Sequence, residues 1–218
     1  RTLITYIKNM MLNEEELQKL EEESDIRIAG IYREYCRQMR EQKLMDYDDQ
    51  MLYAYNILRK DLGVLAYFQN RYPYICVDEA QDTSKIQHAI IALLAAGTGN
   101  LFMVGDEDQS IYGFRAAYPE ALLSFEKKHS GAKVLLMEEN FRSNAKIVEA
   151  ADKFIQKNTL RHEKHMRAAR EAGADIREIS LKSRKAQYVY LMKAAQECTT
   201  GMAGMSGSEE HRGRADAS

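Results

Sequence analysis

Residues 74–84 read Tyr-Ile-Cys-Val-Asp-Glu-Ala-Gln-Asp-Thr-Ser, an apolar run that ends abruptly in two adjacent carboxylates. In a parallel α/β sheet, Asp78 and Glu79 would lie at the carboxyl edge, where the ligands of such sheets bind. Mg²⁺ prefers oxygen ligands, often one or two carboxylates with phosphate oxygens, and a neighbouring carboxylate can orient the attacking water in phosphoryl transfer. The stretch therefore predicts a strand followed by a candidate phosphoryl-transfer site. Taken alone it is not decisive, because acidic pairs at strand ends often just cap the next helix.

The segments that follow alternate between strand and helix patterns. Strands are predicted at 74–77, 101–104 and 133–137, with one more at Ile176–Ile179. Helices are predicted after 85, near Pro119, after a cap at Ser143, and over 184–197. Strands that alternate with helices indicate a parallel sheet covered on both faces.

The first 70 residues, in contrast, have helical patterns with a pause near Gly63. Asn13 and Glu16 are spaced as a capping box, which predicts an acidic helix through about Glu23. A second helix is expected from the apolar spacing of Ile28, Ile31, Tyr32, Tyr35 and Met39. A third is expected to begin at Asp48 with Met51, Leu52, Tyr55 and Leu58 facing inward.

The composition sets limits on the setting of the chain. Of its 218 residues 45% are hydrophobic, and no apolar run approaches the roughly 18 residues of a membrane span. The net charge of −2 means that any contact with nucleic acid must be local. The cysteines Cys36, Cys76 and Cys198 are isolated, which favours a reducing, cytoplasmic setting. Because the chain begins with Arg1 and not with methionine, we expect a piece of a longer protein.

A second polar stretch comes one strand–helix–strand unit later. Residues 104–115 read Val-Gly-Asp-Glu-Asp-Gln-Ser-Ile-Tyr-Gly-Phe-Arg. Two neighbouring strands would thus end in polar loops on one sheet edge, where Gln109 could contact a terminal phosphate or the attacking water. Tyr112 and Phe114 alternate with small residues, so their rings could stack on unpaired bases, although core packing is the simpler explanation.

A third stretch, residues 137–143, reads Met-Glu-Glu-Asn-Phe-Arg-Ser and lies between a predicted strand and a predicted helix. Arg142 would be near a helix start, where anions are favoured over cations. A bound phosphate would explain an arginine there, and so would simple exposure to solvent.

Together the three stretches resemble superfamily 1 DNA helicases of the UvrD/PcrA/Rep type. Residues 78–84 resemble motif II of that family, 105–116 its motif III and 140–143 its motif IV, while Asp46-Tyr47-Asp48-Asp49 resembles a short acidic element that leads into the first motor domain. The resemblance covers roughly residues 46–195. It implies a partial RecA-like P-loop NTPase fold of the α/β class, with a parallel sheet and a helical accessory segment. It also implies an ATP-dependent 3′-to-5′ helicase acting in replication, repair or recombination, with ATP and Mg²⁺ as cofactors and single-stranded DNA as partner.

The resemblance implies a role for each matching position. Asp78 would bind Mg²⁺, and Glu79 would share the metal site and activate the hydrolytic water. Gln109 would sense the γ-phosphate, Phe141 would lie against adenine, and Arg142 would reach the γ-phosphate as an arginine finger. Tyr112 and Phe114 would stack on single-stranded bases, with Arg115 linking the DNA site to the nucleotide site.

The resemblance also implies a division of the chain. Residues 1–46 would be the helical accessory insertion, 47–137 the C-terminal part of the first RecA-like motor domain, and 138–200 the start of the second. Residues 201–218 are expected to be a disordered tail because the sequence there becomes small and polar. We expect the remainder of the helicase to be missing on both sides, because residues 1–218 contain no G-x-x-x-x-G-K-[ST] phosphate loop and the later motifs of the family do not follow residue 200. This chain alone should therefore hydrolyse ATP poorly or not at all.

Two alternatives stay open at this point. The chain could be a non-hydrolysing pseudo-motor that binds single-stranded DNA through Tyr112 and Phe114. It could also belong to the helicase subunit of a nuclease-linked recombination complex, although those subunits tend to carry lysine where this chain has Asp108 before Gln109.

Overall fold

The N-terminal part of the chain is helical, as predicted. The computed structural model describes residues 2–24, 26–110, 113, 116–159 and 161–206, with side chains described up to residue 197. The first three helices are α1 (Thr2–Asn9), α2 (Glu14–Ser24) and α3 (Ile28–Glu41). They pack around a small apolar cluster formed by Ile7, Leu17, Ile28 and Ala29.

Reciprocal capping fixes the start of α2. The backbone N–H of Asn13 donates to the Glu16 carboxylate at 2.8 Å, and the Glu16 N–H donates to the Asn13 side chain at 2.9 Å. The predicted capping box is therefore confirmed.

A buried lysine ties α1 to α4 (Tyr47–Lys60). Lys8 is 2% exposed, and its Nζ lies 2.7 Å from a carboxylate oxygen of Asp46 and 2.7 Å from one of Asp49. The Tyr35 hydroxyl of α3 donates to Asp46 at 2.6 Å. Asp46 is also the N-cap of α4, so that helix begins at Tyr47, one residue before the predicted start.

The predicted pause near Gly63 lies at Asp61. This residue ends α4 and caps α5 (Leu62–Arg71), because its carboxylate accepts the N–H groups of Gly63 and Val64 at 2.9 and 3.0 Å.

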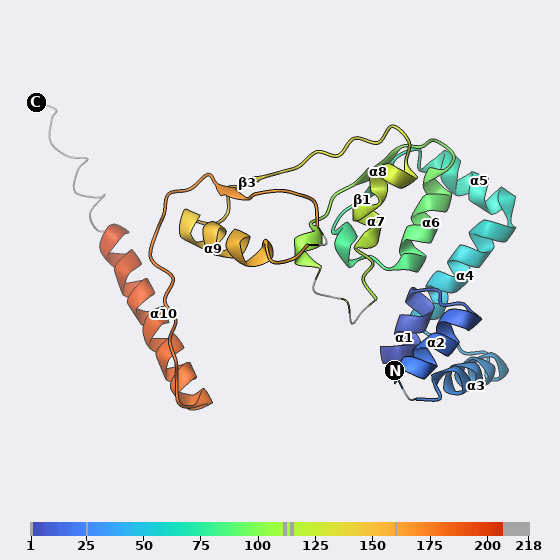
Figure 1. Ribbon diagram of the computed structural model, residues 1–218, viewed down its shortest axis with the longest axis horizontal. Helices are drawn as coiled ribbons and strands as arrows, with labels where there is room; N and C mark the ends of the chain where they lie inside the picture. The colour runs from blue at the N-terminus through green and yellow to red at the C-terminus, as the bar shows by residue number, and fades with distance from the viewer. Residues whose placement is uncertain (1, 25, 111–112, 114–115, 160, 207–218) are drawn as a thin grey trace, which may run out of the picture.

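A short parallel sheet follows. Strand β1 (Ile75–Val77) pairs with β2 (Leu101–Met103), with Ile75 opposite Leu101 and Val77 opposite Met103. The connection between them runs through α6 (Lys85–Ala95), as the apolar spacing predicted. Helix α6 packs against α4 and α5, and Figure 1 shows these helices together at one end of the molecule.

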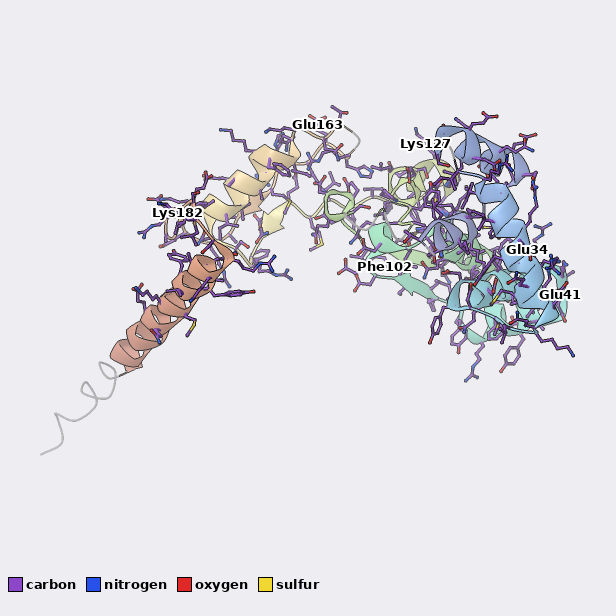
Figure 2. The ribbon with its side chains drawn as sticks, turned by 90° about the horizontal axis from the view of Figure 1, so that it is seen from below. Glu34, Glu41, Phe102, Lys127, Glu163 and Lys182 are labelled. Carbon is purple, nitrogen blue, oxygen red and sulfur yellow. The ribbon has the colours of Figure 1, made fainter. Side chains whose placement is uncertain are left out.

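The outer face of this sheet is open in the described part of the chain. Cys76 is exposed, and its register partner Phe102 is 61% exposed; Figure 2 labels Phe102 beside its strand. The prediction that both faces of the parallel sheet are covered is therefore wrong for the residues that the structure describes.

The remaining elements follow β2 in the sequence. They are the helices α7 (Glu120–Leu123), α8 (Phe125–Lys128), α9 (Ala145–Ile155) and α10 (Arg184–Ser206), and the strands β3 (Glu139–Asn140) and β4 (Arg167–Ala168). Strands β3 and β4 form a second two-stranded parallel sheet. Figure 1 shows β3, α9 and α10 at the end of the molecule away from α4 and α5.

Several predictions for this second half are wrong. Residues 133–137 and 176–179 are not strands, and Leu135 and Met137 are 83% and 81% exposed. Asn144, and not Ser143, caps α9, with its side chain accepting the Ile147 N–H. Pro119 is the N-cap of α7 and not its first residue.

Two further departures concern exposure and length. Met51, predicted to face inward, is 36% exposed, and Ile31 on the apolar face of α3 is 52% exposed. Helix α10 continues to Ser206, six residues into the predicted disordered tail; residues 207–218 lie outside the described part. Within the described ranges, no helix combines the length and apolar character needed to cross a membrane.

Candidate functional site

Asp78 and Glu79 lie at the carboxyl end of β1, as predicted. The pairing with β2 continues one step past the strands: the Val104 N–H donates to the Val77 carbonyl at 2.8 Å, and the Ala80 N–H donates to the Val104 carbonyl at 3.0 Å. Both carboxylates are exposed beyond this last rung. They are therefore available to a ligand at the sheet edge.

Glu79 adopts a left-handed backbone conformation, with φ 49° and ψ 42°. Non-glycine residues rarely adopt this region, and such residues cluster at functional sites. The turn allows the chain to leave β1 sharply into the 3-10 helix Ala80–Asp82. Asp78 and Glu79 thus follow the strand directly, at the point where the chain turns.

Gln81, which was not among the predicted site residues, joins the two polar loops. Its side chain is buried, with the residue 1% exposed. The amide nitrogen donates to the Glu79 carboxylate at 2.8 Å, while the amide oxygen accepts the backbone N–H of Asp106 at 3.0 Å. The signal that could have indicated it is a glutamine, with one donor and one acceptor end, directly between two strand-end loops.

The loop after β2 lies against this glutamine. Gly105 leaves no room for a side chain, because a Cβ there would lie 2.8 Å from the Gln81 amide oxygen and 3.2 Å from the Ala80 nitrogen. Asp106 then caps the 3-10 helix Glu107–Gln109, and its carboxylate accepts the Gln109 side-chain amide at 2.7 Å. Gln109 itself is exposed on the same edge as Asp78 and Glu79.

Phe141 and Arg142 directly follow β3, at the end of the second sheet. The Asn140 side chain accepts the backbone N–H groups of Arg142 and Ser143 at 3.0 and 2.9 Å, a turn that fixes the backbone while leaving the Arg142 side chain exposed. Phe141 is 66% exposed. Figure 1 shows β3 apart from β1, so the structure does not bring these two residues against Asp78 and Glu79.

The predicted DNA-contacting residues Tyr112, Phe114 and Arg115 lie outside the described residues. Their neighbour Ala116 is 1% exposed and has φ 63°.

Comparison with known proteins assigns the family. The model of the UvrD/REP helicase N-terminal domain matches residues 1–130 of the 218-residue chain. The chain belongs to the UvrD/REP helicase family. A relative named ATP-dependent DNA helicase PcrA, from Staphylococcus epidermidis, is 36% identical over 193 residues, which are 87% of this chain and 26% of that protein. A protein of the same name from Staphylococcus aureus is 40% identical over 149 residues, 68% of this chain and 20% of that protein.

The chain thus spans about a quarter or less of the length of these curated relatives. The fold class that the UvrD/REP match and the structure support together is α/β, with short parallel sheets among helices.

The site of this UvrD/REP family member has the donor types that Mg²⁺ requires, but not a closed protein cage. Among the described residues no group of three or more His, Cys, Asp or Glu side chains is arranged to hold a metal. Two exposed carboxylates at a strand end fit an ion that also takes phosphate and water oxygens. One oxygen of Asp82, in the same turn, is buried and accepts no hydrogen bond from a described residue. Buried acceptors usually have a hydrogen-bond partner, so this oxygen has room for a donor or a cation that is not part of the described residues.

Proposed function

We propose that the intact protein is an ATP-dependent DNA helicase that couples Mg-ATP hydrolysis to 3′-to-5′ movement on single-stranded DNA in replication, repair or recombination. The observation that carries the proposal is the shared sheet edge. Asp78 and Glu79 follow one strand, Gln109 follows the next, and the buried Gln81 side chain connects the two loops. Family membership supports the same reaction.

Each residue has a role in this proposal. When bound, Mg²⁺ supplies charge neutralisation at the β- and γ-phosphates of ATP, and Asp78 with Glu79 would hold it. Glu79 would accept a proton from the attacking water, and its hydrogen bond from Gln81 fixes the direction of the carboxylate. Gln109 would contact the terminal phosphate, and Arg142, exposed on the second sheet, would add positive charge when the cleft closes. Tyr112, Phe114 and Arg115 would contact single-stranded DNA, and Phe141 would stack on adenine.

We further assign the β1–β2 sheet to a RecA-like core. Residues 47–137 would be the C-terminal part of the first motor domain, 138–200 the start of the second, and 1–46 a helical accessory segment. The buried ion pairs of Lys8 fasten that accessory segment to α4. Within residues 1–218 no G-x-x-x-x-G-K-[ST] occurs, so this chain alone is expected to hydrolyse ATP poorly.

The test is the substitution Glu79→Gln in the full-length protein. It keeps the side-chain shape and removes the base, so the turnover number of ATP hydrolysis stimulated by single-stranded DNA should fall by about 10²- to 10⁴-fold. Binding of single-stranded DNA, measured by fluorescence anisotropy, should be unchanged. Glu126→Gln, at an exposed glutamate of α8, is the matched control and should retain full activity.

Two outcomes would contradict the proposal. A wild-type protein that binds single-stranded DNA without hydrolysing ATP would favour the pseudo-motor. A Glu79→Gln variant with wild-type turnover would show that another group serves as the base.

A further inference from the structure

A compact group of opposite charges joins the loop after β2 to a segment more than 50 positions later in the chain. We call it the charge clamp; its members are Asp106, Glu107, Asp108, Arg161 and Lys164. Arg161 forms a two-pronged pair with Asp108, with Nε donating at 2.8 Å and Nη2 at 2.6 Å. The Lys164 Nζ lies 2.7 Å from Asp106, 3.2 Å from Glu107 and 3.4 Å from Asp108.

Four of the five side chains of the charge clamp are shielded from water. Those of Arg161 and Asp108 are 5% and 11% exposed, and those of Lys164 and Glu107 are 10% and 6% exposed, whereas the Asp106 side chain is 37% exposed. Burial alone lowers the pKa of Lys164, but its hydrogen bond to Asp106 and the nearby carboxylates outweigh this and raise the pKa. The ammonium is therefore charged at neutral pH. Charges held this way are strongly coupled, because removing one partner leaves the other buried and unpaired.

On one side, the charge clamp connects to the candidate catalytic residues. Asp106 uses one carboxylate oxygen for Lys164 and the other for the side-chain amide of Gln109. Its backbone N–H donates to Gln81, which in turn donates to Glu79. A single lysine thus supports the aspartate from which the contacts to both Gln109 and Glu79 extend.

On the other side, the charge clamp connects to the strand before Arg142. The backbone N–H groups of Arg167 and Ala169 donate to the carbonyls of Glu138 and Asn140 at 2.7 and 3.0 Å. Asn140 in turn fixes the backbone of Arg142. The segment that begins at Arg161 is therefore paired with the strand that directly precedes the proposed arginine finger.

We propose that Arg161 and Lys164 are positioning residues, which lock the loop carrying Gln109 to the segment that holds Arg142. This role rests on the proposed function, because it assigns the two residues to the ATP-hydrolysing reaction. With the charge clamp intact, Gln109 and the Arg142 backbone keep one relative placement. Without it, the Asp106 carboxylate loses its fixed direction, and Gln109 is no longer held toward the sheet edge.

The test is a double-mutant cycle in the full-length protein with Asp108→Ala, Arg161→Ala and the pair. Each single variant should lower the turnover number of DNA-stimulated ATP hydrolysis by about 10- to 100-fold, the size expected when a catalytic group is misplaced by about 1 Å. The KM for ATP should change less than twofold, because the Arg161 guanidinium is already bonded to Asp108 and the proposal gives it no part in binding the nucleotide. The turnover number of the double variant should be no lower than that of the more damaging single variant, because both changes break the same ion pair.

Conservative substitutions and control variants keep the test informative if one of the alanine substitutions prevents folding. Lys164→Arg should keep at least half of the turnover, since it preserves the charge. The turnover number of Asp108→Asn should lie between that of the wild type and that of Asp108→Ala. Arg170→Gln, at an exposed arginine of the same segment, and Glu163→Gln, at the exposed glutamate labelled in Figure 2, should behave as wild type.

Hydrogen exchange of this chain gives a second readout that does not need ATP. In Arg161→Ala, exchange at the backbone amides of Asp106 and Gln109 should become faster, while α4 stays unchanged. Wild-type turnover in Arg161→Ala and Lys164→Ala would overturn the positioning role and leave the proposed function standing. A wild-type protein without DNA-stimulated hydrolysis would overturn the proposed function and this role with it.

Discussion

Replacing Gln81 by methionine tests the connection between the two polar loops. Methionine has a similar length and flexibility but cannot hydrogen bond in this way. The change removes the hydrogen bond to the Glu79 carboxylate. Hydrogen bonds to charged groups contribute about 1.5–3 kcal/mol to stability. The contribution here is at the low end of that range, because the carboxylate is exposed and water can replace the donor. It also leaves the Asp106 N–H without its acceptor, at about 1–3 kcal/mol.

Burial of the methionine side chain offsets about 1 kcal/mol of this loss. The net expectation is a decrease of about 2 kcal/mol in the free energy of unfolding, which for a chain of this size lowers the melting temperature by roughly 4–8 °C. Urea unfolding followed by circular dichroism at 222 nm measures the first quantity, and a thermal scan measures the second. Gln38→Met is the control, because Gln38 is exposed and makes an i,i+4 contact with Glu34 worth at most about 0.5 kcal/mol.

A second variant, Gln81→Glu, should make the free energy of unfolding depend on pH. It keeps the acceptor for Asp106 but places an oxygen where the donor faced Glu79 at 2.8 Å. Two carboxylates at that separation raise the pKa of one of them in the folded state. The loss of stability caused by this repulsion is therefore complete at pH values above the raised pKa. It disappears below the pKa of glutamate in the unfolded chain, which is about 4.3. If Gln81→Met is as stable as Gln38→Met, and Gln81→Glu shows no recovery in acid, the connection through Gln81 does not stabilise the site.

Three other changes have definite expected outcomes. Gly105→Ala should lower the free energy of unfolding by about 1–3 kcal/mol, because its Cβ would lie 2.8 Å from both the Gln81 amide oxygen and a leucine methyl. Gly30→Ala should raise it by about 0.5–1 kcal/mol, since this helical position has nothing within 4 Å of the added Cβ. Lys8→Met should lower it by about 3–5 kcal/mol at pH 7, because two carboxylates lose their partner. The pKa of Asp46 is lowered to about 2, since hydrogen bonds from Lys8 and others outweigh the effect of burial, so its contribution is complete above about pH 4 and is lost as the pH falls toward 2. A urea series from pH 5 to pH 2 should therefore show a smaller acid loss in Lys8→Met than in the wild type, and equal losses would contradict this linkage.

The parts of the fold that depend on neighbours in the sequence could be predicted. Strands β1 and β2 are apolar runs that end in polar loops, and α6 between them has a regular apolar spacing. The capping box at Asn13 involves residues three apart, so its pattern is visible in the sequence. Local order of this kind determines where Asp78 and Glu79 lie.

What could not be predicted depends on distant partners. Residues 133–137 have a strand-like composition, but a strand needs another strand beside it, and Leu135 is instead 83% exposed. The charge clamp joins residues that are 53–58 positions apart, and no periodicity reports such a pairing. Gln81 was missed for the same reason, because its importance comes from Asp106, which is 25 positions away.

The left-handed backbone at Glu79 has an evolutionary consequence. A glutamate in this conformation costs about 1–2 kcal/mol, and glycine would adopt the same angles without that strain. Natural proteins remain only slightly above the stability that they need, so a substitution that relieves strain and harms nothing is readily accepted. A lineage that no longer used this carboxylate would therefore drift toward glycine or asparagine at position 79. A relative with glycine at this position would therefore be expected to have lost both the strain and the use of the carboxylate.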